Sequence, residues 1–247
     1  FGRDHLPGFV AYAYDWRQDV LASSAQFCAF LNELPAANIQ IVAHSMGGFV
    51  TWGCLTSDEA VAQRVRKVVF AGTPFKGGPN SFKSLMLGSP TGLNGKLLSR
   101  EAVFTFGSTW QLLSRESDFF VDAAGAPVAL NAYDPMQWVD GKWGVFTGNT
   151  TLADVALLRQ RIAGHDAMHA RLKEPPLATP EVLAVIGRGH PTVSGVRVTD
   201  KGFDFSNPPT ADGDGSVLLT SAEPPVPFTR LDTTTEHVQL LNDPDVQ

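Results

Sequence analysis

Apolar positions along the first third of the chain follow two alternating patterns. Residues 8–16 (GFVAYAYDW) are rich in aromatic and β-branched side chains, which favours a strand, whereas residues 18–34 place apolar side chains at helical spacing. Short apolar runs at residues 38–44 and 67–71 predict two more strands, and residues 46–55 between them are typical of a helix. Strands that alternate with helices predict a parallel sheet covered by helices on both faces.

The alternation lapses over residues 76–180 and returns at residues 181–187, which predict another strand of the sheet. Residues 195–199 predict a short antiparallel strand, and residues 225–231 predict a last strand. We therefore expect a single domain of the α/β class over residues 1–247.

The insertion that interrupts the alternation is crowded with aromatic and long apolar side chains. It separates two parts of the predicted core, residues 1–75 and 181–247. Such a segment could be a helical subdomain with a small core of its own, or a helical cap or lid that shapes an apolar pocket above the sheet edge. We favour the cap, and Phe75, Phe82 and Trp110 are the candidate substrate-binding side chains.

Composition limits the classes of partner. With 43% hydrophobic and 18% charged residues, the chain can bury one sizeable core. Acidic residues outnumber basic ones by 25 to 19, the formal net charge is -6, and the sequence holds no stripe of Lys and Arg that could neutralise phosphates. We therefore do not expect nucleic acid as a partner. The sequence does not indicate an oligomeric state.

Compartment is less well determined. No run of about 18 apolar residues suggests a membrane span, so a soluble protein is expected. No signal peptide is visible at Phe1, and a secreted location therefore stays open. Cys28 and Cys54 lack the spacing of a zinc site or the density of a disulfide scaffold, so we expect free thiols.

Ser45 is the candidate nucleophile. It follows a predicted strand and precedes a predicted helix, and Ala43 and Gly47 lie two residues to either side of it. Small residues are needed at these positions because the strand turns sharply into the helix and exposes the serine hydroxyl. This context predicts the α/β-hydrolase fold. Gly48 should let the helix approach the sheet.

A serine hydroxyl needs an imidazole that takes its proton and a carboxylate that orients the imidazole. Asp214 and His237 follow in the order Ser, Asp, His that is typical of this fold. Asp212 competes with Asp214, and we prefer Asp214 because residues 215–217 can anchor its loop. Asp212 is better explained as a turn-forming residue before glycine.

Other histidines are weaker candidates. His237 itself could be a surface histidine, but it lies where a polar loop enters an apolar helical start. His44 is expected to be a packed, hydrogen-bonded side chain. His165 and His169 are four residues apart on a predicted helix, but no acidic or cysteine partner at a motif spacing supports metal ligation. We expect neither a metal nor another cofactor.

Acyl transfer also needs donors for the developing oxyanion. The backbone N–H of Met46 is one candidate. The second donor usually comes from a loop after an earlier strand, and no such loop is visible before Gly8. Either N-terminal strands of the fold are missing from the sequence, or residues 1–7 form this part of the site.

Five segments carry a family resemblance: residues 14–17 (YDWR), 43–48 (AHSMGG), 72–78 (GTPFKGG), 212–217 (DGDGSV) and 237–241 (HVQLL). Together they resemble the lecithin:cholesterol acyltransferase and lysosomal phospholipase A family of α/β-hydrolase lipases. The resemblance spans nearly the whole chain and is weakest in the insertion. The first and third segments, in this order, are more specific than the serine motif, which many hydrolases share.

The resemblance implies a lipid acyl ester as substrate, an acyl-Ser45 intermediate, and water or an alcohol as acceptor. It also implies Ser45, Asp214 and His237 as the catalytic residues, together with contact to a lipid surface. Asp15 and Arg17 would form a structural ion pair. The chain departs from the family in two respects. The segment that carries the second oxyanion donor is not visible, and we find no counterpart of the family's cysteine-bridged lid.

Three functions follow as hypotheses. The first is a serine esterase or lipase that cleaves lipid or other apolar acyl esters. The second is an O-acyltransferase that moves the same acyl group to an alcohol. The third is a non-catalytic lipid-binding protein that keeps the fold without a working oxyanion hole.

Overall fold

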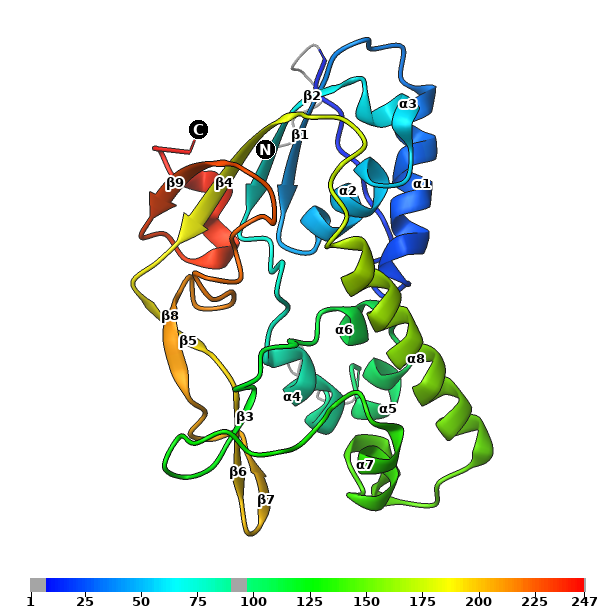
Figure 1. Cartoon of the computed structure of the whole chain (residues 1–247), viewed down its shortest axis with the longest axis vertical. Helices are drawn as coiled ribbons and strands as arrows, with labels where there is room; N and C mark the ends of the chain where they lie inside the picture. Colours follow the sequence, from blue (N-terminus) through cyan, green and yellow to red (C-terminus); the bar gives the residue numbers. More distant parts are fainter. Residues whose placement is uncertain (1–7, 90–96, 247) are drawn as a thin grey trace.

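A four-stranded parallel sheet organises the protein (Figure 1). The computed structural model describes residues 8–89 and 97–246. The strands are β1 (Ile39–His44), β2 (Val65–Ala71), β4 (Glu181–Gly187) and β9 (Thr229–Thr233), in the order β1-β2-β4-β9. All three strand pairs are parallel, so the four carboxyl ends meet at one edge of the sheet. This confirms the predicted α/β class and its parallel sheet.

Helices flank the sheet. Helices α1 (Val20–Glu33) and α2 (Gly47–Leu55) pack against each other beside β1, followed by the short α3 (Glu59–Ala62). Side chains of β1 alternate between buried and exposed, and the buried ones join the core that these helices form with the sheet. Near β4 and β9 lies the 3-10 helix η2 (His237–Asn242).

Residues 8–16 do not form the predicted strand. Instead, the ring of Tyr12 packs against Phe27 and Phe30 of α1, with centroid distances of 4.8 and 4.9 Å. A strand also needs a neighbouring backbone for its hydrogen bonds, and among the described residues β1 pairs only with β2. Aromatic and β-branched composition indicated contact with a core but could not show whether a pairing partner was present.

The insertion builds a second hydrophobic core. Its elements are α4 (Asn80–Leu87), α5 (Arg100–Phe104), α6 (Gly107–Gln111), β3 (Phe120–Val121), α7 (Pro135–Asp140), η1 (Gly144–Thr147) and α8 (Leu152–Arg171). The rings of Phe82, Trp110 and Trp138 lie at the centre of this core and are fully buried. In Figure 1 these elements lie below the carboxyl ends of the sheet strands, and the long α8 connects them to the region of α2.

Small strands extend below the sheet on the other side. Strand β5 (His190–Val193) pairs antiparallel with β8 (Thr210–Gly213). Strand β6 (Val196–Thr199) pairs antiparallel with β7 (Gly202–Asp204), which confirms the antiparallel strand predicted at residues 195–199. Because β6 also pairs in parallel with β3, these strands tie the insertion to the second half of the core.

Cys28 and Cys54 form a disulfide, so the prediction of free thiols was wrong. Cys28 lies on α1 and Cys54 on α2, and their Cα atoms are 5.4 Å apart. Sequence spacing could not show this pairing, because only the packing of the two helices brings the residues together. The bond fixes α1 against the helix that follows Ser45.

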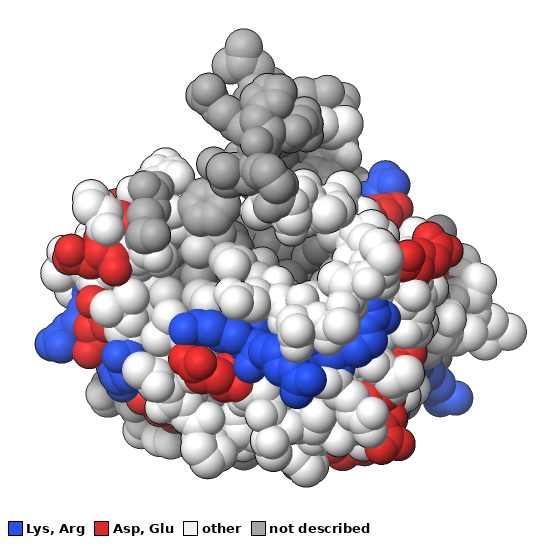
Figure 2. All heavy atoms as spheres, turned by 90° about the horizontal axis from the view of Figure 1, so that it is seen from above, with Lys and Arg blue, Asp and Glu red and all other residues white. Residues whose placement is uncertain are grey.

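The surface above the amino ends of the strands carries mixed charge. Figure 2 shows a row of Lys and Arg side chains across this face, with Asp and Glu beside them. Near these strand ends, Lys67 pairs with Glu181 at 2.9 Å, and Arg230 pairs with Glu223 and Asp232 at 2.8 Å each. The sequence did not indicate this row of Lys and Arg side chains. That nucleic acid is not a partner stays a prediction. Within the described ranges, no helix is long and apolar enough to cross a membrane.

Candidate active site

Ser45 lies in a strained turn at the carboxyl end of β1. Its φ is 54°, and Lys142 is the only other non-glycine residue with positive φ among those described. A left-handed conformation is costly for a residue with a side chain, and such strain is concentrated at functional sites. The backbone N–H of Ser45 donates to the carbonyl of Ala71 at 2.9 Å, which ties the turn to the end of β2.

Gly48 lets α2 approach the end of β2. A Cβ atom at this position would lie 2.0 Å from Oγ1 of Thr73, a distance that no side chain can tolerate. Gly47 is less restricted, because the nearest atom to its hypothetical Cβ is Oη of Tyr14 at 3.9 Å. Of the two glycines, position 48 is therefore the one that the packing of this turn requires.

His237 and Asp214 form a buried pair. Nδ1 of His237 lies 2.8 Å from Oδ2 of Asp214, and the backbone N–H of His237 donates to the Asp214 carbonyl at 3.0 Å. Asp214 is 1% exposed, and its Oδ1 accepts from the backbone N–H of Ser216 at 2.9 Å and of Val217 at 2.7 Å. Because the carboxylate is an acceptor, His237 carries a hydrogen on Nδ1, and Nε2 is free to accept a proton.

Burial is the largest influence on the pKa of Asp214, and it favours the neutral acid. Hydrogen bonds from His237 and from the backbone of Val217 and Ser216 outweigh it and hold this pKa below its usual value. Asp214 is thus held as an anion beside the imidazole. An anion at this place is what the predicted triad requires of its acid, because such an anion stabilises an imidazolium.

Two glycines leave room for this pair. A Cβ on Gly72, which follows β2 and has φ 57°, would lie 2.9 Å from Nδ1 of His237 and 3.0 Å from Oδ2 of Asp214. A Cβ on Gly187, at the end of β4, would lie 2.4 Å from Cβ of Asp214. In the sequence, Gly187 falls in a predicted strand and Gly72 in a motif segment, and the spacing of either glycine from residues 214 and 237 gave no signal of this contact.

Asp212 faces elsewhere. Its Oδ1 accepts from the backbone N–H of Gly189 at 2.6 Å, in the turn between β4 and β5. This bond is consistent with the interpretation of Asp212 as a turn-forming residue.

His44 contacts the same loop from the sheet. Its Nε2 lies 2.8 Å from the carbonyl oxygen of His237, and the two ring centroids are 4.6 Å apart. The prediction that His44 is a packed, hydrogen-bonded side chain is confirmed. The sequence gave no indication that its partner would be residue 237.

The predicted nucleophile and the predicted base are not hydrogen-bonded to each other in this structure. Within the described chain, no hydrogen bond joins Oγ of Ser45 to Nε2 of His237. Such contacts are often long when no substrate is bound. The backbone N–H of Met46, the predicted oxyanion donor, donates to no atom of the described residues. The alternative location of a second donor, residues 1–7, lies outside the described residues.

His165 and His169 lie on α8, where the insertion meets the core. Their rings stack at a centroid distance of 4.1 Å, and their Nε2 atoms donate to the carbonyls of Leu113 at 3.2 Å and Gln111 at 3.1 Å. Burial lowers the pKa of His165 to about 2 and that of His169 to about 4. Both histidines are therefore neutral, and their hydrogen bonds join α8 to residues 111–113. The described part of the chain contains no group of three or more potential metal ligands.

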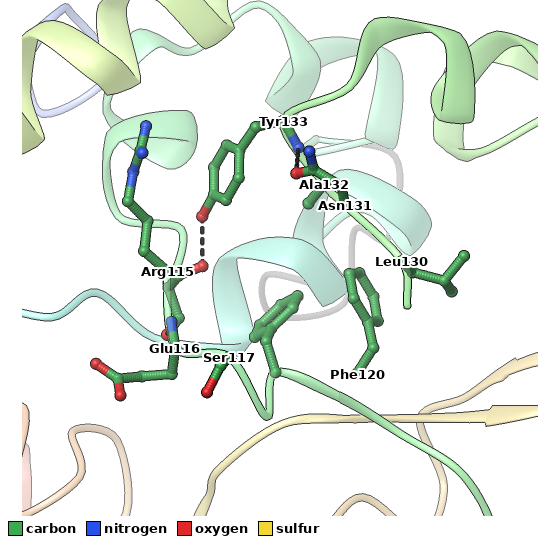
Figure 3. Close-up of a pocket in the computed structure, with 10 residues that line it drawn as sticks. Arg115, Glu116, Ser117, Phe120, Leu130, Asn131, Ala132 and Tyr133 are labelled. Atoms are coloured by element: carbon green, nitrogen blue, oxygen red, sulfur yellow. Dashed lines mark hydrogen bonds between the residues drawn. The ribbon is translucent and has the colours of Figure 1, made fainter. Parts of the chain in front are cut away.

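A cavity of about 250 Å³ lies in the insertion, and Figure 3 shows the side chains that line it. Arg115, Phe120 and Tyr133 are among the residues that line it. The hydroxyl of Tyr133 donates to the carbonyl of Ser114. None of the predicted triad residues lines this cavity.

The three predicted substrate-binding side chains are buried. Phe82 and Trp110 are 0% exposed inside the insertion, and Phe75 is 6% exposed and packs with Trp52 and Phe70 in the main core. Their contact with substrate stays a prediction. For Phe82 and Trp110 it would require the insertion to open.

Residues 4–119 match the family model of lecithin:cholesterol acyltransferase. This confirms the family resemblance for the three motif segments that the match contains, over a little less than half of the 247 residues. The matched stretch contains Ser45 but ends before Asp214 and His237. The match supports an enzyme of the lipid esterase or acyltransferase class. No curated protein matches the chain.

Among solved structures, one described as "The crystal structure of Tle4-Tli4 complex" superposes with a TM-score of 0.55 at 15% sequence identity. The alignment covers 92% of this chain and 64% of that chain, so this chain spans slightly less than two thirds of the neighbour's length. Similarity at this level concerns the fold alone. With the parallel sheet and its flanking helices, it supports the predicted α/β-hydrolase fold.

Proposed function

We propose that this protein hydrolyses carboxylic esters of lipids through an acyl-Ser45 intermediate. The observation that carries the proposal is the 2.8 Å bond between Nδ1 of His237 and Oδ2 of Asp214. It leaves the other ring nitrogen of His237 free, and the His237 ring packs against His44, the last residue of β1, which immediately precedes Ser45. An oriented imidazole near a serine hydroxyl is the arrangement that acyl transfer requires.

The chemistry would proceed in two halves. In the first, Oγ of Ser45 attacks the ester carbonyl carbon while Nε2 of His237 takes the hydroxyl proton. The N–H of Met46 stabilises the oxyanion, and removal of one such donor typically costs about 3 kcal/mol. The intermediate collapses as His237 returns the proton to the departing alcohol. In the second half, water gives a proton to Nε2 of His237 and attacks the acyl-Ser45 carbonyl. The bond from the carbonyl carbon to Oγ then breaks, His237 returns the proton to Oγ of Ser45, and the acid leaves.

An apolar cavity supports a lipid substrate. It has a volume of about 660 Å³ and is lined by Asp15, Trp16, Arg17, Leu97, Leu98, Ala102 and Phe106. Trp16 is 48% exposed and Leu97 is 61% exposed, although both are large apolar side chains. Asp15, which lines the cavity, follows Tyr14 in the chain, and the Tyr14 hydroxyl lies 3.9 Å from the position that a Cβ on Gly47 would occupy. An acyl chain or the edge of a lipid surface could therefore bind close to the nucleophile.

Asp15 and Arg17 would shape one wall of this cavity. Nε of Arg17 lies 2.8 Å from Oδ1 of Asp15, and Nη2 lies 2.8 Å from Oδ2. This two-point contact lowers the pKa of Asp15 to about 2, so the pair stays charged. We assign it a structural role.

Residues 76–180 would act as the cap of this site, with residues 1–75 and 181–247 as the core. The separate hydrophobic core of the insertion and its place below the carboxyl ends of the strands support this division (Figure 1). The disulfide supports a protein that folds in an oxidising compartment, as secreted proteins do.

Transfer of the acyl group to an alcohol is a second candidate function, because the family match includes acyltransferases by name. It differs from hydrolysis only in the acceptor for acyl-Ser45. A non-catalytic lipid-binding protein is the third, because only one oxyanion donor can be named among the described residues.

Labelling with a fluorophosphonate, followed by peptide mass spectrometry, tests the nucleophile. We expect one adduct, on Ser45, and none in the Ser45→Ala variant. Incubation of the wild type with phosphatidylcholine or triacylglycerol vesicles, with and without an added alcohol, then identifies the acceptor from the released acid or new ester. An intact, folded wild type that remains unlabelled while it binds fatty acid would favour the non-catalytic alternative.

A further inference from the structure

We infer that His44 is a positioning residue that locks the loop of the base His237 onto the strand that carries the nucleophile. The inference rests on the proposed function, because it assigns a role relative to Ser45 and His237. It depends on one contact between residues that are 193 positions apart in sequence.

The contact has a defined chemistry. The carbonyl oxygen of His237 can only accept, and Nε2 of His44 lies 2.8 Å from it. His44 therefore carries a hydrogen on Nε2. The imidazole also packs against the His237 ring, with 4.6 Å between centroids and 41° between planes. The side chain of His44 thus restrains both the backbone and the ring of residue 237.

Together with Asp214, His44 holds residue 237 at two backbone atoms. The N–H of His237 donates to the Asp214 carbonyl at 3.0 Å, and its carbonyl accepts from His44. Asp214 fixes the base relative to the loop after β8, but it does not fix it relative to β1. Within the described residues, the contact of His44 is the hydrogen bond that joins residue 237 to β1.

The place of His44 in the chain makes this bond matter for catalysis. His44 is the last residue of β1 and immediately precedes Ser45. A displacement of the loop relative to His44 is therefore also a displacement of the base relative to Ser45. A shift of about 1 Å between reacting groups can reduce the rate about a hundredfold. No direct hydrogen bond between Ser45 and His237 compensates for such a shift in this structure.

Three variants separate the hydrogen bond from packing. In His44→Gln the amide nitrogen can reach the position of Nε2, and in His44→Asn a shorter amide cannot. His44→Phe keeps a ring against His237 but has no donor. We expect the Asn and Phe variants to lose about ten- to a hundredfold in kcat on an activated ester, with KM within about twofold of the wild type. The Gln variant should recover most of that loss.

A second measurement does not depend on turnover. In 15N-histidine NMR spectra of the resting protein, we expect His44 as the Nε2–H tautomer. The ring signals of His237 should shift or broaden in His44→Phe and return toward the wild-type positions in His44→Gln. Circular dichroism melting curves identify any variant that fails to fold. The kcat values and NMR signals of the wild type are then compared with those of the folded variants.

The outcomes distinguish the two proposals. A wild type that hydrolyses no ester and is not labelled at Ser45 contradicts the proposed function, and the NMR comparison still decides whether His44 fixes residue 237. Equal kcat values in the folded variants of an active enzyme overturn the positioning role. Unchanged His237 ring signals in His44→Phe overturn it in either case.

Discussion

Thr73 fills the space beside Gly48. Its side chain is fully buried, and its Oγ1, Cγ2 and Cβ atoms lie 2.0, 2.4 and 2.7 Å from the position that a Cβ on Gly48 would occupy. The contact joins the helix that follows Ser45 to the turn after β2. It couples two motifs that are separate in the sequence.

Substitution Gly48→Ala should destabilise the protein. The added methyl group must displace Thr73 or α2, and overpacking of this kind costs about 1–3 kcal/mol in the free energy of unfolding. Urea denaturation measures the loss, and ester hydrolysis should fall with it because the displaced helix begins next to Ser45. Gly47→Ala is the matched control, since the nearest atom to its new Cβ lies at 3.9 Å. Similar losses in both variants would contradict the assigned packing.

The hydroxyl of Thr73 should be dispensable for folding. Within the described chain its Oγ1 is buried and has no hydrogen-bond partner, which is unfavourable for a polar atom. Thr73→Val keeps the shape and removes the polar atom, so we expect equal stability or a gain of about 1 kcal/mol. Thr73→Ser keeps the hydroxyl and loses the methyl group, and it should be less stable than the wild type. Thermal melting of the three proteins should reveal this order.

Reduction of the disulfide should lower stability. The two cysteines are 26 positions apart, and a cross-link that closes a loop of this size stabilises a protein by about 3 kcal/mol in the chain-entropy description. The Cys28→Ala/Cys54→Ala double variant should therefore unfold at a lower urea concentration than the oxidised wild type. Addition of a phosphine reductant should affect the wild type and leave the double variant unchanged. An identical response of both proteins would argue against the bond.

Stability should fall in mild acid. A histidine in an unfolded chain titrates near pH 6.5, whereas burial lowers the pKa of His169 to about 4 and that of His165 to about 2. Below pH 6.5 the unfolded state therefore binds more protons than the folded state, and the free energy of unfolding decreases as the pH falls. At pH 5 each histidine should cost about 2 kcal/mol relative to pH 8.

Urea midpoints between pH 8 and pH 5 measure this effect. His169→Gln can keep the bond to the Gln111 carbonyl without a titrating group, so it should show a smaller decrease over the same interval. A decrease as large as that of the wild type would show that His169 is not a source of the acid sensitivity.

Substitution of the two acidic residues of one loop should separate orientation of the base from turn formation. Asp214→Asn should lower kcat about 10³- to 10⁴-fold, because an amide no longer stabilises the imidazolium and can favour the wrong tautomer. Asp212→Asn keeps an oxygen that can accept from Gly189, so only a small change is expected. Both rates are measured on one activated ester. A greater loss in Asp212→Asn would reverse the assignment of the triad acid.

The sequence was informative where a local pattern determines the backbone. The strands at residues 39–44, 65–71 and 181–187 and the helices at residues 20–33 and 47–55 lie close to their predicted positions, because burial of alternate or helically spaced side chains is a local property. The last strand is shifted to residues 229–233. Ser45 could be proposed because small residues around a serine between strand and helix indicate a sharp turn.

Contacts between distant segments could not be predicted in the same way. Residues 8–16 have the composition of a strand, but strand formation depends on a neighbouring backbone. Cys28 and Cys54 are joined because two helices pack together. The partner of His44 follows from the return of the chain to the sheet edge 193 positions later.

The sequence by itself determined the class of fold, the turn at Ser45 and the order in which Asp214 and His237 follow it. Only the tertiary structure decided that Asp214 faces His237 while Asp212 binds the backbone of Gly189, and that Gly72 and Gly187 leave room for the pair. The physical reason is that hydrophobic periodicity reports on burial along one element. The direction of a carboxylate and the space around it depend on loops whose positions the whole fold sets.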